Sequence, residues 1–153
     1  ACGQEDIHRA VDTTGYTDLD TLMGMARHTD LFLFDLKFMD TEKHRRYTGV
    51  SNEQILENLE ALARYGSRII IRIPLIPGIN DDEDNINRTA TYLAHLPQIK
   101  KVHILPYHDF QKSKYDKFSM NYNAHDVKPP SPDRVEAIQK YLAGIGLSVE
   151  VGG

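Results

Sequence analysis

The protein is a chain of 153 residues, 41% hydrophobic and 26% charged, a composition that suits one globular unit with a single core and excludes a disordered chain. Its formal net charge of -4 gives no attraction to nucleic acid or to an anionic membrane, because binding phosphates requires a basic surface. The single cysteine, Cys2, excludes an internal disulfide, and without an apolar stretch of about 18 residues or a signal-type segment we expect a cytoplasmic protein.

The first apolar run, Ile7 to Val11, is expected to form a strand that Asp12 and Thr13 follow directly. Little sequence precedes this run and the chain has no initiator methionine, so we expect a piece of a longer protein. Helical spacing from Leu19 to Arg27 favours a short helix, and the motif LFLFDLKFM predicts a second strand from Leu31 to Leu36.

The stretch after Ser51 has a clear helical period. Ser51 and Gln54 match a capping box, and Gly66 suits the end of the helix because glycine readily adopts the left-handed conformation found there. One face of this helix is expected to point inward through Ile55, Leu56, Leu59 and Leu62.

The second half of the chain continues the alternation. We expect a strand from Arg68 to Ile76, a helix from Asp81 or Asp82 to about Leu96, a strand from Lys101 to Leu105, a helix from Ser131 and Pro132 to Gly144 or Gly146, and a strand from Leu147 to Val151. The expected inward residues are Ile86, Ala90 and Leu93 in the first helix and Val135, Ile138, Tyr141 and Leu142 in the second.

Strands that alternate with helices are joined by right-handed crossovers into a parallel sheet. The sequence therefore predicts an α/β fold in one unit over residues 1–153, with strands apolar enough on both faces to lie beneath helices. An open sheet and a sheet curled toward a barrel both satisfy this pattern.

Polar side chains lie on or just after four of the expected strands. They are Asp12 and Thr13, then Asp35 and Lys37, then Arg72 with the turn PGIND, and finally Tyr107 with His108. In parallel α/β folds the chemistry lies at the carboxyl ends of the strands, since the loops there are free to vary. We therefore expect one shared site.

Asp35 and Lys37 alternate onto the same face of their strand. One interpretation is a structural ion pair. The other is a site, because desolvation cancels most of the attraction within an isolated buried pair. Asp12, at the neighbouring strand end, brings a second carboxylate close. Lys37, a cation held by oxygens of Asp12, Thr13 and Asp35, or the amino group of a ligand can relieve their repulsion.

Arg72 on a core strand requires an anionic or carbonyl partner. Pro77 and Gly78 stiffen the next turn, which suits an ordinary strand-to-helix turn or a close approach of the backbone to a flat group. His103 and His108 fall on opposite faces of their strand, which speaks against a shared metal.

Residues 109–130 have little helical period. Their lysines and aromatic residues fit single-stranded nucleic acid, but nearby aspartates offset most of the positive charge. Long loops in compact domains are usually functional, so we interpret this stretch as a loop that covers a substrate.

The motifs DTTGY, DLKFMD, GVSNEQILENL, RIPLIPGIND, LPYH and VKPP, in this order, resemble the later part of the glycyl-radical enzyme activating enzymes. The type they resemble is that of the pyruvate formate-lyase activating enzymes, which are radical S-adenosylmethionine proteins. The resemblance covers nearly all of the chain but only part of the family's domain. It implies an incomplete parallel (β/α) barrel, with about four barrel strands plus a terminal helix and strand.

The family carries a CxxxCxxC loop that holds a [4Fe-4S] cluster, followed by a GGE-type motif, and neither occurs in this sequence. One cysteine cannot supply three cluster ligands. We therefore expect Cys2 to be an inert thiol, the cluster-binding part to lie outside this chain, and no catalytic residue to lie within it.

The resemblance implies that S-adenosylmethionine binds to Asp12, Thr13, Asp35, Lys37, Arg72 and His108. The first three match positions near the methionyl carboxylate, where the family can hold a monovalent cation. The others match positions that contact the polar groups of the cofactor or line the same cavity. The long loop after His108 is similar to the segment near the incoming glycyl loop of the protein substrate.

For the intact protein the resemblance implies reductive cleavage of S-adenosylmethionine at the cluster. The resulting 5'-deoxyadenosyl radical abstracts a hydrogen atom from a backbone glycine of a partner glycyl-radical enzyme. A flavodoxin or ferredoxin-type reductant is implied to act through the missing part. Residues of this chain would position the cofactor and the partner.

Two other functions fit the residues. The first is a non-catalytic interaction domain, which coding sequence with CxxxCxxC upstream would exclude. The second is a (β/α)-barrel aldolase or hydrolase that uses Asp35, Lys37 and the histidines with a bound metal or a Schiff base. A partial barrel without its first strands exposes an apolar edge, so we expect dimerisation or limited solubility.

Overall fold

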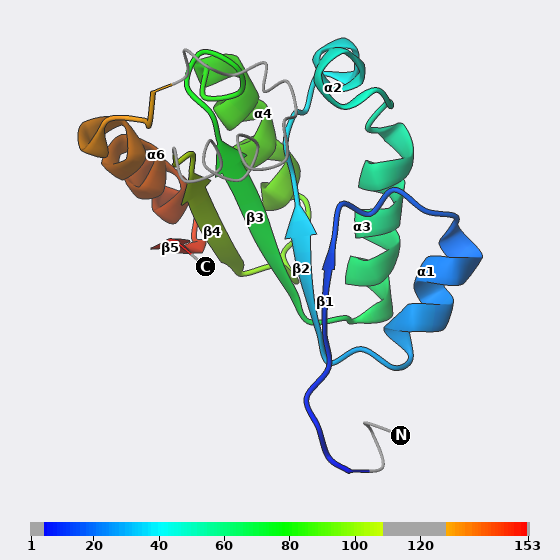
Figure 1. Ribbon diagram of the computed structural model, residues 1–153. Helices are drawn as coiled ribbons and strands as arrows, with labels where there is room; N and C mark the ends of the chain where they lie inside the picture. Colours follow the sequence, from blue (N-terminus) through cyan, green and yellow to red (C-terminus); the bar gives the residue numbers. More distant parts are fainter. Residues whose placement is uncertain (1–4, 109–127, 153) are drawn as a thin grey trace, which may run out of the picture.

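Figure 1 shows a computed structural model of the chain, which describes residues 5–108 and 128–152. Within these ranges five strands form one sheet in the order β1-β2-β3-β4-β5, and all neighbours are parallel. The strands are β1 (Ala10–Thr13), β2 (Leu31–Asp35), β3 (Ile69–Leu75), β4 (Lys101–Pro106) and β5 (Ser148–Val151). The predicted α/β fold with a parallel sheet is confirmed, and the sheet is open.

The first strand lies further along the chain than the sequence predicted, because β1 begins at Ala10 and not at Ile7. Ile7 is 55% exposed. Arg9 donates from its backbone and its guanidinium to the carboxylate of Asp30, just before β2, at 2.8 to 2.9 Å. This contact sets where the two strands begin to pair, so Asp12 and Thr13 belong to β1. The other four strands match their predicted bounds to within one residue.

The described helices are α1 (Leu19–Ala26), α2 (Thr41–Thr48), α3 (Glu53–Tyr65), α4 (Glu83–Ala94) and α6 (Pro132–Gly144). Asp82 caps α4 and Ser131 caps α6 with their side chains, as the sequence indicated. Helix α2 was not predicted, because its sequence TEKHRRYT lacks an apolar stripe. The sequence nonetheless carries a capping residue at each end of α2. Asp40 accepts from the backbone N–H of Lys43, and Gly49 ends the helix at a φ of 86°.

Two details of the predicted helices are wrong. The expected capping box at Ser51 does not form, since Asn52 precedes α3 and the Ser51 hydroxyl lies 3.4 Å from the Glu53 carboxylate. Tyr141 on α6 was expected to point inward but is 45% exposed. Helix α6 packs beside β4 and β5 at one end of the sheet, so only a narrow stripe of it is buried.

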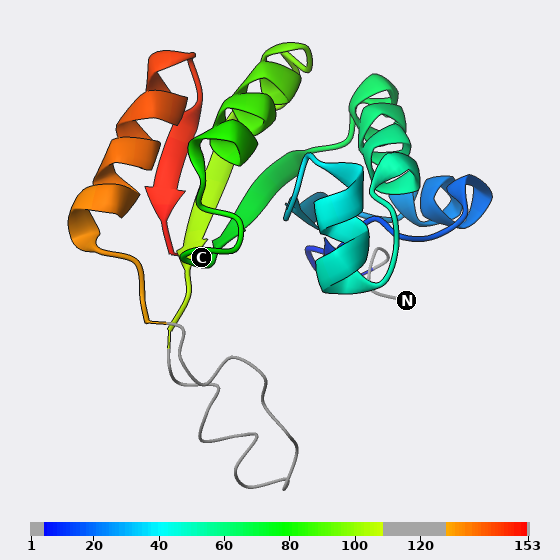
Figure 2. The same cartoon turned by 90° about the horizontal axis from the view of Figure 1, so that it is seen from above.

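Helices α1, α3, α4 and α6 lie on one side of the sheet (Figure 2). The strand residues on that side are fully buried: Phe32, Phe34, Ile71, Ile73, Val102 and Ile104. The alternate strand residues, such as Leu31, Leu33 and Ile70, are only half-buried. In the described ranges no helix covers this second side, which we call the open face. The strands were predicted to lie beneath helices on both faces of the sheet, and in the described ranges this is correct for one face and wrong for the other.

None of the helices in residues 5–108 and 128–152 is long and apolar enough to cross a membrane.

Candidate functional site

Three charged side chains from three neighbouring strands meet on the open face. Arg72 on β3 pairs in register with Asp35 on β2, and its Nε and Nη2 lie 2.9 and 2.8 Å from Oδ1 of Asp35. The same Nη2 also pairs with the carboxylate of Asp12 on β1. Two carboxylates therefore share one guanidinium, and the sequence-based expectation that Asp12 and Asp35 approach each other is confirmed.

Lys37 adds a second cation to this cluster. Its Nζ lies 3.7 Å from Oδ2 of Asp35, so the carboxylate of Asp35 stands between an ammonium and a guanidinium. Three groups were suggested from the sequence to relieve the repulsion between the two carboxylates. One of them, Lys37, does contact Asp35, but Arg72, which was not among them, contacts both carboxylates. The register β2–β3 explains this contact, because it sets Asp35 beside Arg72. We call Asp12, Asp35, Lys37 and Arg72 the charged cluster.

The two ion pairs of Arg72 differ in strength. The side chain of Asp35 is 15% exposed, whereas that of Asp12 is 62% exposed and is screened by water. Burial by itself lowers the pKa of the Arg72 guanidinium, but its hydrogen bonds to Asp12 and Asp35 outweigh this effect and raise the pKa. The guanidinium remains charged, and Asp35 is its main partner.

The structure does not bring the hydroxyl of Thr13 to the charged cluster. Thr13 pairs with Phe34 and, by strand alternation, points to the opposite side of the sheet from Asp12. Its Oγ1 accepts a hydrogen bond of 2.9 Å from the backbone N–H of Gly15. Asp12 and Asp35 are thus the two suggested cation ligands whose side chains lie together.

His108 lies just past the end of β4 and is exposed. The preceding residue, Tyr107, donates its backbone N–H to the carbonyl of Leu75 at 2.9 Å, which holds this segment at the carboxyl end of β3. The long loop interpreted as a substrate cover begins at residue 109, and its residues 109–127 lie outside the described ranges.

Buried asparagines hold the loops beside the charged cluster. They are Asn52, Asn58, Asn80 and Asn85, and none of them was predicted from the sequence. Asn80 and Asn85 both donate to the carbonyl of Lys37, at 3.1 and 3.3 Å. Asn85 also accepts from the backbone N–H of Met39 at 2.9 Å. Hydrogen bonds from the segment that follows β3 therefore hold the loop after β2 in place.

Asn58 fixes the loop after β1 in the same way. From α3 its side-chain amide donates to the carbonyls of Gly15 and Thr17 at 2.8 and 2.7 Å. A signal for this role was present, because Asn58 falls on the inward face of its helix beside Ile55 and Leu62, where a polar side chain needs partners.

A cavity of about 280 Å³, which we call the α2 cavity, adjoins the charged cluster. Its lining combines Asp35 and Lys37 with residues of α2, of α3 and of the turns after β1 and α2. Its lining residues are Thr14, Tyr16, Asp35, Lys37, His44, Thr48, Val50 and Ile55. No site is predicted here from the sequence, because α2 has no apolar stripe that would predict it.

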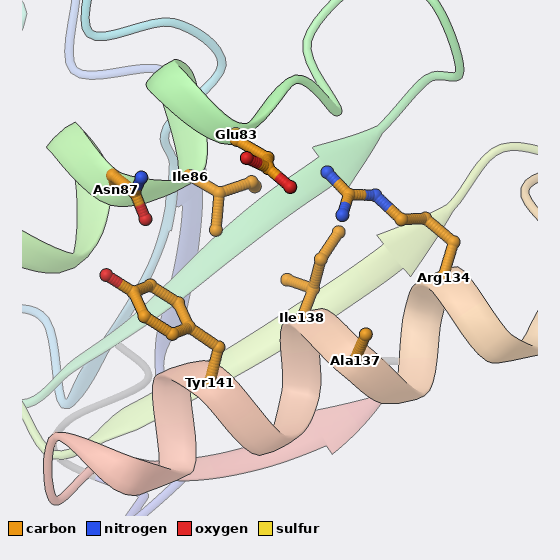
Figure 3. A pocket seen from close by; sticks show the side chains of 7 residues that line it. All are labelled: Glu83, Ile86, Asn87, Arg134, Ala137, Ile138 and Tyr141. Atoms are coloured by element: carbon orange, nitrogen blue, oxygen red, sulfur yellow. The ribbon is translucent and has the colours of Figure 1, made fainter.

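A second cavity of about 310 Å³ lies between α4 and α6, in the helix layer on the other side of the sheet (Figure 3). Ile86 and Ile138 are buried at its base, and Arg134 at its rim donates to the carbonyl of Asp81. The cavity therefore follows from helix packing and lies apart from the polar strand ends. Among the described residues, no group of three or more His, Cys, Asp or Glu side chains is placed to hold a metal ion.

Comparison with known proteins gives consistent matches. Residues 1–90 match the model of the radical SAM superfamily. The chain is 38% identical to the trans-4-hydroxy-L-proline dehydratase activating enzyme of Clostridioides difficile, covering 99% of this chain and 51% of that protein. It is 33% identical to the pyruvate formate-lyase 1-activating enzyme of Escherichia coli (strain K12), covering 97% of this chain and 61% of that protein.

A solved structure agrees with these relatives. The crystal structure of a domain of pyruvate-formate lyase-activating enzyme from Bacteroides vulgatus superimposes with a TM-score of 0.83 at 37% sequence identity. The match covers 99% of this chain and 85% of that one. This chain thus spans between half and two thirds of the curated relatives named above, and most of the solved domain.

Proposed function

The chain belongs to the radical SAM superfamily, among the activating enzymes of glycyl-radical enzymes, and on this premise we propose that it is the part of such an enzyme that positions S-adenosylmethionine and the protein partner. The whole protein then generates a glycyl radical on a partner enzyme by abstracting a hydrogen atom. Because the chain spans only part of its curated relatives, this activity belongs to the longer protein.

The family implies two groups, a [4Fe-4S] cluster and S-adenosylmethionine. The residues of this chain do not fit the cluster, since its sequence has one cysteine and cluster ligation requires several. They do fit the methionyl end of S-adenosylmethionine. A zwitterion needs an anion for its ammonium and a cation for its carboxylate, and the charged cluster presents both signs at one edge of the sheet. When bound, the cofactor supplies the radical chemistry.

The observation that carries this proposal is that Asp12 and Asp35 share Arg72 on the open face of the sheet, with Lys37 beside them. Neighbouring cations keep these carboxylates oriented without a ligand, so they need little rearrangement to bind one. Asp12, Asp35, Lys37, Arg72 and His108 remain the proposed cofactor-binding residues, with a monovalent cation near Asp12 and Asp35. Thr13, whose hydroxyl points away from the charged cluster, belongs to this proposal only through its backbone.

The names of the relatives support the kind of partner, because each relative activates another enzyme. We assign a glycyl-radical enzyme as the partner here. A flavodoxin or ferredoxin-type reductant acting through the rest of the protein, self-association of this chain, and a cytoplasmic location belong to the same proposal.

The test uses the complete protein that carries this chain, produced without oxygen. We expect iron-sulfur absorption, and a glycyl radical seen by electron paramagnetic resonance when S-adenosylmethionine, a reductant and a glycyl-radical enzyme of the same organism are added. Lys37→Met is expected to weaken S-adenosylmethionine binding by about tenfold, the value of one charge-assisted hydrogen bond, while the cluster absorption stays. Cluster formation without any radical on any such partner would contradict the proposed function.

A further inference from the structure

His44, on α2, is the one titratable side chain of the α2 cavity wall that is almost wholly buried, with 4% exposure. Its Nδ1 lies 2.7 Å from the carbonyl of Val50. A carbonyl can only accept, so Nδ1 carries a hydrogen. Thr48 uses its own hydroxyl hydrogen on the carbonyl of His44, at 2.7 Å. In the neutral ring, Nε2 is therefore a hydrogen-bond acceptor.

Nε2 of His44 has no hydrogen-bond partner among the described residues. Among the described residues, every buried side-chain nitrogen or oxygen that solvent cannot reach has a hydrogen-bond partner. Nε2 is therefore reached by solvent, although its residue is nearly buried, and the α2 cavity is the opening that His44 lines. A buried acceptor left open to a cavity is what a ligand donor would use.

The other groups of the cavity narrow the class of ligand. Lys37 lines the same cavity and offers an ammonium donor, and Val50 with Ile55 adds apolar surface. Lys37 and Asp35 line the cavity together as an ion pair of 3.7 Å, so their charges offset each other and favour a ligand group without net charge. An acceptor and a donor in one partly apolar cavity complement a peptide backbone, in which N–H donors and C=O acceptors alternate along the chain.

We propose that the α2 cavity receives a backbone segment of the partner enzyme, with one amide N–H donating to Nε2 of His44 and a neighbouring carbonyl accepting from Lys37. This inference rests on the proposed function and adds the place where the partner binds. Lys37 belongs both to this cavity and to the charged cluster, so the segment would lie directly beside the cofactor-binding residues.

Two substitutions distinguish the roles of the two ring nitrogens of His44. In His44→Asn, the side-chain amide nitrogen takes the position of Nδ1 and keeps the bond to Val50, but nothing remains at Nε2. In His44→Gln, the amide reaches the position of Nε2 and the bond to Val50 is lost. If His44 has only a structural role, His44→Asn should lose less function than His44→Gln. If His44 binds the partner, His44→Gln should keep more of the partner binding than His44→Asn. His95→Asn is the control, because His95 is exposed at the C-cap of α4 and makes the same Nδ1 contact to a backbone carbonyl, that of Thr91, at 2.7 Å.

The measurement is the affinity of the complete, cluster-loaded protein for a synthetic peptide copied from the glycine-bearing segment of its partner, together with the KM for the intact partner. His44→Asn is expected to weaken peptide binding and to raise that KM by about fivefold, the value of one hydrogen bond. Its affinity for S-adenosylmethionine is expected to stay unchanged. His44→Gln should bind the peptide better than His44→Asn while unfolding at lower denaturant concentration, and His95→Asn should match the wild type.

Equal KM for the partner in His44→Asn and the wild type overturns the inference, as does a larger loss in His44→Gln. A weaker affinity of His44→Asn for S-adenosylmethionine in place of the peptide assigns the cavity to the cofactor and overturns it too. These outcomes differ from failure of the proposed function, in which the wild type itself forms no radical on the partner.

Discussion

At the scale of single residues, the turn after β1 depends on Gly15. Its φ is +74°, and a Cβ at this position would overlap the ring of Phe34, which is fully buried. The backbone of this turn therefore lies against the core side of the sheet, and its carbonyl is held by Asn58. The chain needs glycine here both for backbone conformation and for space.

We predict that Gly15→Ala lowers the free energy of unfolding by about 3 kcal/mol, as the sum of left-handed strain and overpacking against Phe34. Denaturant unfolding measures this loss. Gly66→Ala is the matched control, because Gly66 has a φ of +84° with nothing within 4 Å of its Cβ position. It should lose only the strain, about 1 kcal/mol. Equal losses in both variants would show that Phe34 can move aside.

The residue-scale expectations for Asp12, Asp35 and Lys37 followed from strand alternation, which needs only local sequence. The pairing of both carboxylates with Arg72 did not follow from it. Arg72 lies 37 residues beyond Asp35 in the chain, and only the register between β2 and β3 brings them together.

At the scale of elements, loops after different strands are tied to one another by buried amides. Asn85 on α4 is the clearest case, since it bonds to Met39, Lys37 and Asn80. The loop after β2 is thereby fixed by a helix that follows β3. The position of Lys37 therefore depends on contacts between the loop after β2 and the segment after β3, and not on its own strand alone.

We predict that Asn85→Ala destabilises the fold by about 2 to 3 kcal/mol, because it leaves the buried N–H of Met39 without a partner. Chemical unfolding gives the value. Asn87→Ala on the exposed side of the same helix should change the free energy of unfolding by less than about 0.5 kcal/mol. Similar losses in the two variants would contradict the role given to the buried amide.

A second tie joins the start of β1 to the start of β2. The side chain of Arg9 hydrogen-bonds to Asp30, and its backbone N–H adds a further bond, so the pKa of the Asp30 carboxyl is held far below its ordinary value of 3.8. A lowered pKa in the folded state stabilises the fold above the unfolded-state value, and this stabilisation is lost as the pH falls below that value.

We therefore expect the wild type to lose stability between about pH 5 and about pH 3, and Asp30→Asn to lose less over this range. Urea unfolding at several pH values measures both slopes. Asp20→Asn, an exposed change on α1, serves as the comparison. A slope for Asp30→Asn as steep as that of the wild type would rule out Asp30 as a source of the acid sensitivity.

At the scale of the whole molecule, the sheet is covered by helices on one side only, within the described ranges. The half-buried residues Leu31, Leu33 and Ile70 lie on the open face, and β1 forms an edge of the sheet. Open apolar faces and unpaired edges favour association with another chain.

We predict that the 153-residue chain self-associates at micromolar concentration and that Leu33→Lys shifts it toward the monomer, since a charge on the open face must be desolvated in any such contact. Sedimentation velocity measures the distribution of species. A clean monomer for the wild-type chain would count against the prediction.

The sequence by itself determined the alternation of strands and helices, the parallel sheet, and the meeting of polar residues from neighbouring strands, with Asp12 close to Asp35. These features follow from periodicity and from the way parallel strands are connected, which are local properties. The motif resemblance also pointed to the family that the comparisons then showed.

Only the tertiary structure decided which partner each polar group has. Helix α2 lacks an apolar stripe, the α2 cavity forms between α2, α3 and two strand ends, and the buried asparagines bond to residues as many as 48 positions away. Partners so distant in sequence meet through strand register and helix packing, and no local pattern encodes that meeting. For the same reason Thr13, a neighbour of Asp12 in sequence, directs its hydroxyl away from the charged cluster.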